Sequence, residues 1–333
     1  MSTTTAETGH PRAINSAAND ADSGGSMGLG YDGKLYILAF DHRGSFTKRF
    51  GIEGDPPPED MQRLADGKQL IFEGIEAALE RGADPSVTGA LVDEQFGGPR
   101  RVPEQAKARG IRLAMPVEKS GQKEFDFEYG EDFGAHIERY DPDFSKVLVR
   151  YNPEGDAEMN RRQAQRLRHL SEWLHERDRK FLFELLVPAE EGQLASVDGD
   201  SDRYDAELRP ELMRRAITEL QDAGVEADVW KIEGVDERAD CERIAAQCRA
   251  GGRDRVVCVV LGRGADDDKV DHWLRQGAPV EAYVGFAIGR SIWDDPLKGF
   301  IAGSLSRQAA AAQVADSYLR FVEVYTSAEA PVG

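Results

Sequence analysis

The feature that most constrains the fold is an alternation of short apolar segments with longer amphipathic ones, which starts at Lys34 and continues along the chain. Segments with the length and composition of buried strands lie at 35–41, 89–93, 111–117, 146–151, 181–187, 228–233, 255–261 and 282–288. Between them, apolar residues recur with helical spacing, as at 69–81, 161–177, 212–223 and 240–250. This alternation of βα units, with no second composition zone, predicts an α/β fold: a single (β/α)8 TIM barrel over residues 34–326.

The alternative to a barrel is an open, doubly wound sheet, but no G-x-G-x-x-G pattern follows the first predicted strand. Residues 1–33 are rich in Ser, Thr, Ala, Asn and Gly and predict a disordered tail, and residues 327–333 predict a flexible one. Polar insertions interrupt the repeat at 123–143 and 192–209. Because loops after barrel strands build active sites, the first insertion is a lid, a subunit contact or simply a solvated loop.

The net charge of −19 argues against a nucleic-acid partner, because phosphate backbones need basic surfaces. No apolar run is long enough to span a bilayer, and the N-terminal residues contain no signal-peptide core. We therefore expect no membrane partner and a cytoplasmic location. The cysteines match no zinc spacing, so we expect reduced thiols at Cys241, Cys248 and Cys258.

The six histidines form no H-x-H or H-E-x-x-H pattern, so we expect neither a metal nor another cofactor. His169 and His175 lie on the polar side of a predicted helix, where we expect them to be exposed. His42 follows the first strand, where it would line the mouth of the barrel or serve a structural role.

The segment VWKIEG, residues 229–234, places a lysine inside the predicted barrel. Strand side chains alternate between interior and helix layer, so Trp230 and Ile232 suit the helices while Lys231 points inward with Val229 and Glu233. A buried lysine is costly unless it is paired or used. Burial and neighbouring cations lower the pKa of a lysine amine and make it a nucleophile toward carbonyls. A structural Lys–Glu ion pair is the alternative.

The same alternation predicts inward-facing charges near the carboxyl ends of other strands. Lys146 shares a face with Leu148 and Arg150, and Glu184 shares one with Leu182 and Leu186. The full predicted set of inward charges is Asp41, Lys119, Lys146, Glu184 and Lys231. Several charges converging on one end of a barrel indicate a reaction site rather than scaffolding.

A Schiff-base aldolase needs this mixture of groups. It needs an amine nucleophile, a second cation beside it, and a carboxyl that moves protons while a C–C bond breaks. Lys231, Lys146 and Glu184 fill these roles in that order. Asp41 would orient a substrate hydroxyl or act as the base at the hydroxyl where cleavage occurs.

A phosphate site is predicted in the loops after the seventh and eighth strands, where TIM barrels often bind phosphate. Gly262 and Gly289 would let backbone N–H groups approach the phosphate, and Arg290 would add a bidentate charge. Arg43, after the first strand, and Arg150, at the end of the fourth, are further candidates for binding the substrate or its phosphate.

Segments in barrel order carry a resemblance to a known family: FDHRGSFTKRFG, LVDEQFGG, PVEKSG, KVLVRYNP, FLFELL, DVWKIEG and FAIGRSIW. Together they resemble the class I aldolase group that includes tagatose-bisphosphate aldolase and sulfofructosephosphate aldolase. PVEKSG, VDEQFG and GFAIGR favour the aldolase module of myo-inositol catabolism, which is often fused behind a sugar kinase. The resemblance covers residues 34–325, without the kinase, so the expected role is the cleavage step alone.

The resemblance implies cleavage of 2-deoxy-5-keto-D-gluconate 6-phosphate to dihydroxyacetone phosphate and malonate semialdehyde. The family's Schiff-base lysine, proton-shuttling glutamate, supporting lysines, first-strand aspartate and phosphate-binding arginine fall on Lys231, Glu184, Lys119 with Lys146, Asp41 and Arg290. The seventh-strand turn departs from the pattern, because LGRG stands at 261–264 where bisphosphate aldolases carry a serine.

Three alternatives remain at this point. The same mechanism could act on a ketose bisphosphate or a sulfosugar phosphate. A lyase or isomerase on the same barrel could abstract a proton through Glu184 and Asp41 without an imine. A non-catalytic barrel could bind a sugar phosphate. The partner we expect is a phosphorylated small molecule, and the sequence leaves open a homo-oligomer formed through the C-terminal helix with Tyr318, Phe321 and Val322.

Overall fold

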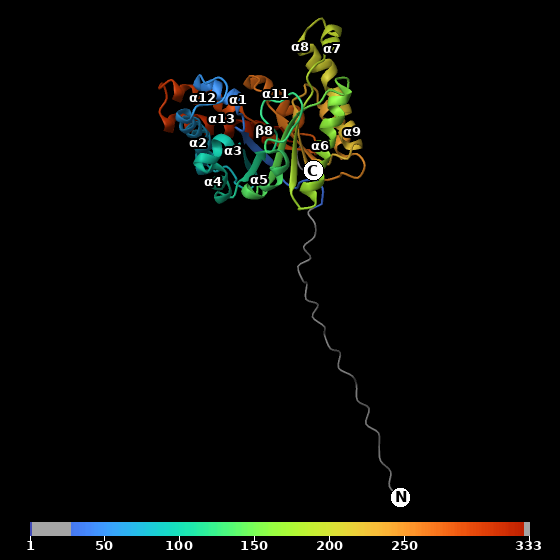
Figure 1. The fold of residues 1–333 in the computed structure, drawn as a ribbon, viewed down its shortest axis with the longest axis horizontal. Coiled ribbons are helices and arrows are strands. Elements are labelled where there is room, and N and C mark those ends of the chain that lie inside the picture. The colour runs from blue at the N-terminus through green and yellow to red at the C-terminus, as the bar shows by residue number, and fades with distance from the viewer. Residues whose placement is uncertain (2–27, 330–333) are drawn as a thin grey trace.

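The computed structural model describes Met1 and residues 28–329, which form a closed barrel of parallel strands surrounded by helices (Figure 1). Neighbouring strands in the chain are neighbours in the barrel, and the last strand closes on the first. The strands are β1 Leu35–Ala39, β2 Thr88–Leu91, β3 Arg112–Pro116, β4 Phe144–Arg150, β5 Lys180–Leu186, β6 Val229–Glu233, β7 Val257–Leu261 and β8 Tyr283–Ile288. Each predicted strand is confirmed, and the closed order excludes the open sheet.

Helices follow every strand, as in a TIM barrel. The longer ones are α2 Pro58–Glu80, α4 Val102–Ala108, α5 Phe133–Tyr140, α6 Ala157–His175, α9 Arg209–Asp222, α10 Arg238–Arg249, α11 Asp267–Gly277, α12 Arg290–Ile301 and α13 Arg307–Ala328. Shorter turns are α1 Gly44–Thr47, η1 Lys48–Phe50, α3 Glu94–Gly97, η2 Gly98–Arg100, η3 Gly130–Asp132, α7 Glu191–Ser196, α8 Ser201–Arg203 and the π-turn η4 Tyr204–Leu208. The four helices predicted from spacing are confirmed, with α2 starting earlier because Pro57 and Pro58 preset its first turn.

The barrel has two apolar layers, because both faces of a parallel sheet are buried. Small and branched side chains fill the interior, among them Ala39, Ala114 and Val259. Larger side chains such as Trp230 and Phe286 face the helices. The interior is apolar only up to the middle of the strands, and polar side chains take over at their carboxyl ends.

The predicted face is correct for β1, β4, β5 and β6 but wrong for β3. Leu113, Met115 and Val117 face the helix layer, while Ala114 points inward. The alternation therefore places Glu118 inside the barrel, where it is 7% exposed, and leaves Lys119 exposed. The expectation that Lys119 points inward is thus a register error of one residue.

Both insertions are folded and lie at the carboxyl ends of the strands. In the first, Glu118 and Phe127 form a β-bridge, and Phe127 stacks on Phe133 with ring centroids 4.4 Å apart. Phe125 is buried, so this segment is not a solvated loop. In the second insertion, α7 and α8 project from the rest of the fold beside α9 (Figure 1). The hydroxyl of Tyr204 donates to the Val187 carbonyl at 2.9 Å and anchors this insertion after β5.

Residues 28–33 were expected to belong to the tail, but they are bound to the amino-terminal end of the barrel. The Gly30 N–H donates to Asp228 Oδ1 at 2.8 Å, and the Tyr31 N–H donates to the Arg255 carbonyl at 2.9 Å. The buried Asp228 also pairs with His175, at 3.0 Å from Nε2 to Oδ2. The position of His175 on its helix predicted an exposed side chain, but this contact leaves it half-buried. The remainder of the predicted tail, residues 2–27, lies outside the described residues.

The C-terminal helix α13 closes the helix ring of its own chain. Tyr318 and Phe321 are buried, and the Tyr318 hydroxyl donates to the Tyr36 carbonyl at 2.9 Å. The helix continues to Ala328, two residues into the predicted tail, while residues 330–333 lie outside the described part. Within the described residues, no helix is both long and apolar enough to cross a membrane. The three cysteines are buried free thiols.

Candidate active site

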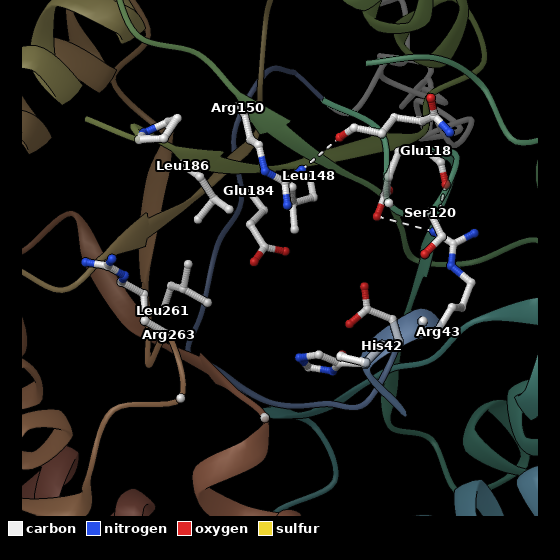
Figure 2. A pocket seen from close by; sticks show the side chains of 18 of the residues that line it. His42, Arg43, Glu118, Ser120, Leu148, Arg150, Glu184, Leu186, Leu261 and Arg263 are labelled. Atoms are coloured by element: carbon white, nitrogen blue, oxygen red, sulfur yellow. Dashed lines mark hydrogen bonds and ion pairs between the residues drawn. The ribbon is translucent and has the colours of Figure 1, made fainter. Parts of the chain in front are cut away.

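A cavity of about 1160 Å³ opens at the carboxyl ends of the strands. Residues at or after the ends of β1 and β3 to β8 line it, as do both insertions. Figure 2 shows the labelled side chains around its centre, with Arg263 and Leu261 on one side, Arg43 and Glu118 on the other, and Glu184 between them. The predicted residues Asp41, Arg43, Lys119, Lys146, Arg150, Glu184, Lys231, Gly289 and Arg290 all line this cavity.

Lys146 is the centre of a buried cluster of charges. Its Nζ lies 2.7 Å from Asp41 Oδ2, 2.8 Å from Glu118 Oε1 and 3.0 Å from Glu184 Oε2. The lysine side chain is 2% exposed, and each carboxyl is at most 9% exposed. The carboxyls come from three different strands, so the closed barrel is what brings them together.

Lys231 joins this cluster through Glu184. The two residues face each other across the β5–β6 pair, and Lys231 Nζ lies 3.0 Å from Glu184 Oε2. The same oxygen contacts Lys146 Nζ, so a single carboxylate oxygen bridges two ammonium groups. Lys231 is 2% exposed yet lines the cavity, which leaves its amine open to a ligand there.

The electrostatics of the cluster favour ionised groups around Lys146. Burial lowers the pKa of Lys146, but the charges of Asp41, Glu118 and Glu184 outweigh burial and raise that pKa above its usual value. Burial raises the pKa of Asp41, but Lys146 and Lys231 hold it well below its usual range. Burial also raises the pKa of Glu184, but Lys146 and Lys231 lower it below its usual value.

Glu118 is the carboxyl that reasoning from the sequence missed. Burial raises its pKa, and although Lys146 and Arg43 pull it down, the pKa stays above its usual value. Its Oε2 is buried without a hydrogen-bond partner. The sequence contained the signal, because placing the small Ala114 on the inner face instead of Leu113 would have turned this glutamate inward.

Arg43 and Arg150 hold different positions at the rim. The Arg43 guanidinium donates to the Glu118 carbonyl at 2.7 Å and to Glu128 Oε2 at 2.8 Å, so this arginine ties the end of β1 to the first insertion. Arg150 donates to the Gln122 carbonyl at 2.9 Å, and no carboxylate pairs with it among the described ion pairs. Arg150 thus offers charge to an anionic ligand.

The loops after β7 and β8 bring Arg290 to the cavity, as predicted, but with a different glycine. Gly262 is buried against Ile288 and Val270 and is not among the residues that line the cavity, so its predicted contact with phosphate gains no support here and stays a prediction. Gly264 does line it, with a φ of +74°, and the Arg290 guanidinium packs where its Cβ would be. Arg290 also donates to the Arg263 carbonyl at 2.6 Å, which fixes it beside this turn.

Gly289 lines the cavity for a packing reason. A Cβ at this position would meet the Ala39 carbonyl and the His42 ring, so only glycine allows β8 to approach β1 so closely. It precedes the first residue of α12, whose N-terminal N–H groups suit an anion. The predicted contact of Gly289 with phosphate is compatible with this position and stays a prediction.

A second ion-pair network holds the β7 side of the site and was not predicted. Glu233 Oε1 lies 3.0 Å from Arg209 Nη1 and 3.0 Å from Arg263 Nε. Asp205, from the second insertion, also contacts Arg263, at 2.6 Å. Glu233 is therefore a structural anchor for Arg263, which has a positive φ of +52°. The contacts of Arg263 with Asp205 and Glu233, from two distant segments, stabilise this strained backbone conformation at the edge of the cavity.

His42 contributes a neutral ring to the cavity wall. Burial lowers its pKa to about 4, with Lys68 and Lys231 adding to this effect against Asp41. Lys68 itself is fully buried and pairs with Asp93 at 2.7 Å beneath the site. Among the described residues, no group of three or more His, Cys, Asp or Glu side chains is arranged to hold a metal ion.

The family of the chain follows from comparison with known proteins. A family model described as "Uncharacterized protein conserved in bacteria (DUF2090)" matches residues 30–329. The chain belongs to this family. A search of curated proteins finds no match.

One of the solved structures similar to this DUF2090 chain is fructose-bisphosphate aldolase from Plasmodium falciparum, in complex with TRAP and a small molecule inhibitor. The TM-score is 0.61 and the sequence identity 13%, over 89% of this chain and 90% of the other. At this identity the likeness shows a common fold.

The site of the DUF2090 chain can therefore be stated chemically. It has a buried amine in contact with the cavity, and a carboxylate within hydrogen-bonding distance of that amine. It has a second buried cation, and arginines at the rim that are free to bind an anion. Such a set suits covalent chemistry at the carbonyl group of an anionic substrate.

Proposed function

We propose that this chain is a class I aldolase that forms a Schiff base between Lys231 and a phosphorylated keto-sugar. The observation that carries the proposal is the contact of one Glu184 oxygen with both lysine amines, at 3.0 Å each, on the floor of the cavity. A structural ion pair would need one carboxylate per lysine and no access to a cavity. Here the amine, its proton acceptor and a second cation meet where a ligand can reach them.

Glu184 is placed to move protons for Lys231. Glu184 first takes a proton from the Lys231 ammonium group, which leaves the neutral amine that attacks the ketone. It gives this proton to the carbonyl oxygen as the C–N bond forms, and takes a second proton from the nitrogen. Donated to the carbinolamine hydroxyl, the second proton allows water to leave and gives the iminium. The low pKa of Glu184 keeps it ionised and ready to accept, while Lys146 supplies the positive charge that balances it.

Asp41 is placed to act in the C–C cleavage. When the bond breaks, its electrons flow into the iminium and form an enamine, and the hydroxyl on the departing carbon loses its proton to become an aldehyde. Asp41 is an ionised carboxylate beside Lys146 and lines the cavity, so it can accept that proton. Protonation of the enamine and hydrolysis then release the ketone product.

The substrate we propose is 2-deoxy-5-keto-D-gluconate 6-phosphate, cleaved to dihydroxyacetone phosphate and malonate semialdehyde. Arg290 and the turn at Gly264 would bind the phosphate next to the keto group. Arg43, Arg150 and Lys119 lie at the rim of the cavity and would bind the acidic end. A ketose bisphosphate or a sulfosugar phosphate fits the same mechanism, and a substrate panel separates them.

The test is release of dihydroxyacetone phosphate from each of these substrates by the wild-type chain and by Lys231→Met. We expect cleavage of the keto-gluconate phosphate by the wild type, and loss of cleavage in the variant. Retained cleavage in Lys231→Met would instead support proton abstraction without an imine. No cleavage of any of the sugar phosphates by a folded wild type, together with their binding, would support a non-catalytic barrel.

A further inference from the structure

We infer that Glu118 binds the aldehyde half of the substrate as a neutral carboxylic acid, donating a hydrogen bond from Oε2 to an acceptor oxygen such as a carboxylate. The inference rests on the proposed function and adds to it the chemical class of the departing aldehyde.

The geometry leaves one oxygen of Glu118 free for a ligand. Its Oε1 lies 2.8 Å from Lys146 Nζ and 3.6 Å from Arg43 Nη2. Its Oε2 is buried and has no partner among the described residues, although the side chain lines the cavity. A buried polar atom without a partner is costly, and a ligand in the cavity would satisfy it.

The balance of charges around Glu118 calls for one proton. Asp41, Glu118 and Glu184 surround Lys146, and within residues 28–329 Lys231 contributes the only other ammonium group in contact with this cluster. Three carboxylates against two ammonium groups leave an excess of one negative charge in a buried site. Arg43 does not correct it, because Glu128 pairs with this arginine at 2.8 Å.

The extra proton belongs on Glu118. Its pKa is raised by burial, against the pull of Lys146 and Arg43 and with a further contribution from Asp41, whereas the pKa values of Asp41 and Glu184 are lowered. Because Oε1 accepts from Lys146, the proton resides on Oε2. The free oxygen is therefore a donor, and it points to an acceptor on the ligand.

The position of Glu118 in the barrel assigns it to the aldehyde half. In the closed order of eight strands, β3 lies four strands from β7, which is the opposite side of the mouth. Arg263 and Gly264 follow β7, and Figure 2 shows Arg263 and Glu118 on opposite sides of Glu184. With the phosphate held beside Gly264 and the ketone at Lys231, the rest of the carbon chain extends toward Glu118.

A neutral acid at this point selects the aldehyde by charge. An ionised carboxylate would repel a carboxylate on the substrate, whereas a protonated one donates a strong, charge-assisted hydrogen bond to it. An environment that keeps a carboxylic acid neutral so that it can donate is an established use of burial. The site therefore favours an aldehyde that carries an acid group, as malonate semialdehyde does.

The experiment compares Glu118→Gln, Glu118→Ala and the control Glu131→Gln in the condensation of dihydroxyacetone phosphate with malonate semialdehyde. Glutamine keeps both an acceptor for Lys146 and a donor for the ligand. Glu131 is exposed on the first insertion and does not line the cavity, so the control removes a carboxylate that does not contact the charge cluster. Borohydride trapping of dihydroxyacetone phosphate alone is measured in each variant, because this half-reaction does not use the aldehyde.

We expect Glu131→Gln to match wild-type kcat/KM, Glu118→Gln to stay within about threefold of it, and Glu118→Ala to lose roughly tenfold or more through KM for the aldehyde. Trapping should be unchanged in all three. Wild-type kcat/KM should also fall as the pH rises through the pKa of Glu118, and this limb should be absent in Glu118→Gln. That pH profile decides the matter if Glu118→Ala does not fold.

The inference is overturned if Glu118→Ala condenses malonate semialdehyde normally. It is also overturned if Glu118→Gln loses the reaction while trapping persists, since Glu118 would then act as a charged carboxylate. A wild-type chain that traps no ketone contradicts the proposed function itself, which distinguishes the two failures.

Discussion

Replacing Lys146 with methionine tests the buried charge cluster directly. Methionine has a similar length and can fill the same space, but it offers no charge to the three carboxyls that lie 2.7, 2.8 and 3.0 Å from the ammonium group. Removing one partner of a buried ion pair costs about 3 to 5 kcal/mol, because the remaining charge stays buried and unpaired. We expect the free energy of unfolding at about pH 7 to fall by that amount.

The pH dependence of the variant should differ from that of the wild type. In the wild type, the lowered pKa values of Asp41 and Glu184 contribute stability that is present above their unfolded values, about 4, and is lost as the pH falls through the folded values. The raised pKa of Glu118 acts in the other direction, because this carboxyl gains a proton more readily in the folded state. Without Lys146, burial raises the folded pKa values of all three carboxyls, so Lys146→Met should gain more stability than the wild type on acidification from about pH 7 to about pH 5.

The assay is equilibrium unfolding in urea, followed by circular dichroism at both pH values. Arg150→Met is the matched control, since Arg150 lies on the same face of β4 but contacts only a backbone carbonyl at the rim. We expect that control to cost less than about 1 kcal/mol, with no change in pH dependence. A loss below about 1 kcal/mol in Lys146→Met, or the same pH dependence as the wild type, would refute the cluster as described.

Three further predictions follow from the site. Glu184→Gln should lower kcat for cleavage by roughly 10²- to 10⁴-fold with little change in KM, as measured by release of dihydroxyacetone phosphate; an unchanged kcat would remove Glu184 from proton transfer. Gly264→Ala should lower the free energy of unfolding by about 1 to 3 kcal/mol, because the φ of Gly264 is +74° and Arg290 occupies the Cβ position. The same change should raise KM for phosphorylated substrates. Unchanged thermal unfolding together with an unchanged KM would exclude this turn from the phosphate site. The pKa of His42 is lowered from 6.5 to about 4, so its neutral ring contributes stability that is fully present above pH 6.5 and is lost as the pH falls toward 4. His42→Gln should flatten the curve of unfolding free energy against pH in this range. A curve identical to that of the wild type would contradict the assignment.

The sequence predicted the strands and four of the five inward faces because alternation continues without interruption to the carboxyl end of β1, β4, β5 and β6. On β3 it failed for a physical reason. Large apolar side chains at Leu113, Met115 and Val117 looked like the inner face, but both faces of a barrel strand are buried. The narrow interior takes Ala114, while the large side chains fill the space under the helices.

The contacts that shape the rest of the site join residues far apart in the chain. Asp205 lies in the insertion after β5 and contacts Arg263 in the turn after β7, and Glu233 pairs with the same arginine. No local pattern in the sequence encodes that contact, because it depends on how the loop folds back. Glu118 was missed because the wrong face of β3 was assigned to the interior. Gly264 lines the cavity where Gly262 was predicted to, and this depends on the path of a single turn.

The central claim is that Lys231 forms a covalent imine, and borohydride trapping tests it most directly. The purified chain is incubated with dihydroxyacetone phosphate and borohydride, digested, and analysed by peptide mass spectrometry, alongside an aldolase that traps normally. We predict a reduced adduct on the peptide containing Lys231 and none in Lys231→Met. A folded wild-type chain without an adduct, or with an adduct that persists in Lys231→Met, would contradict the account.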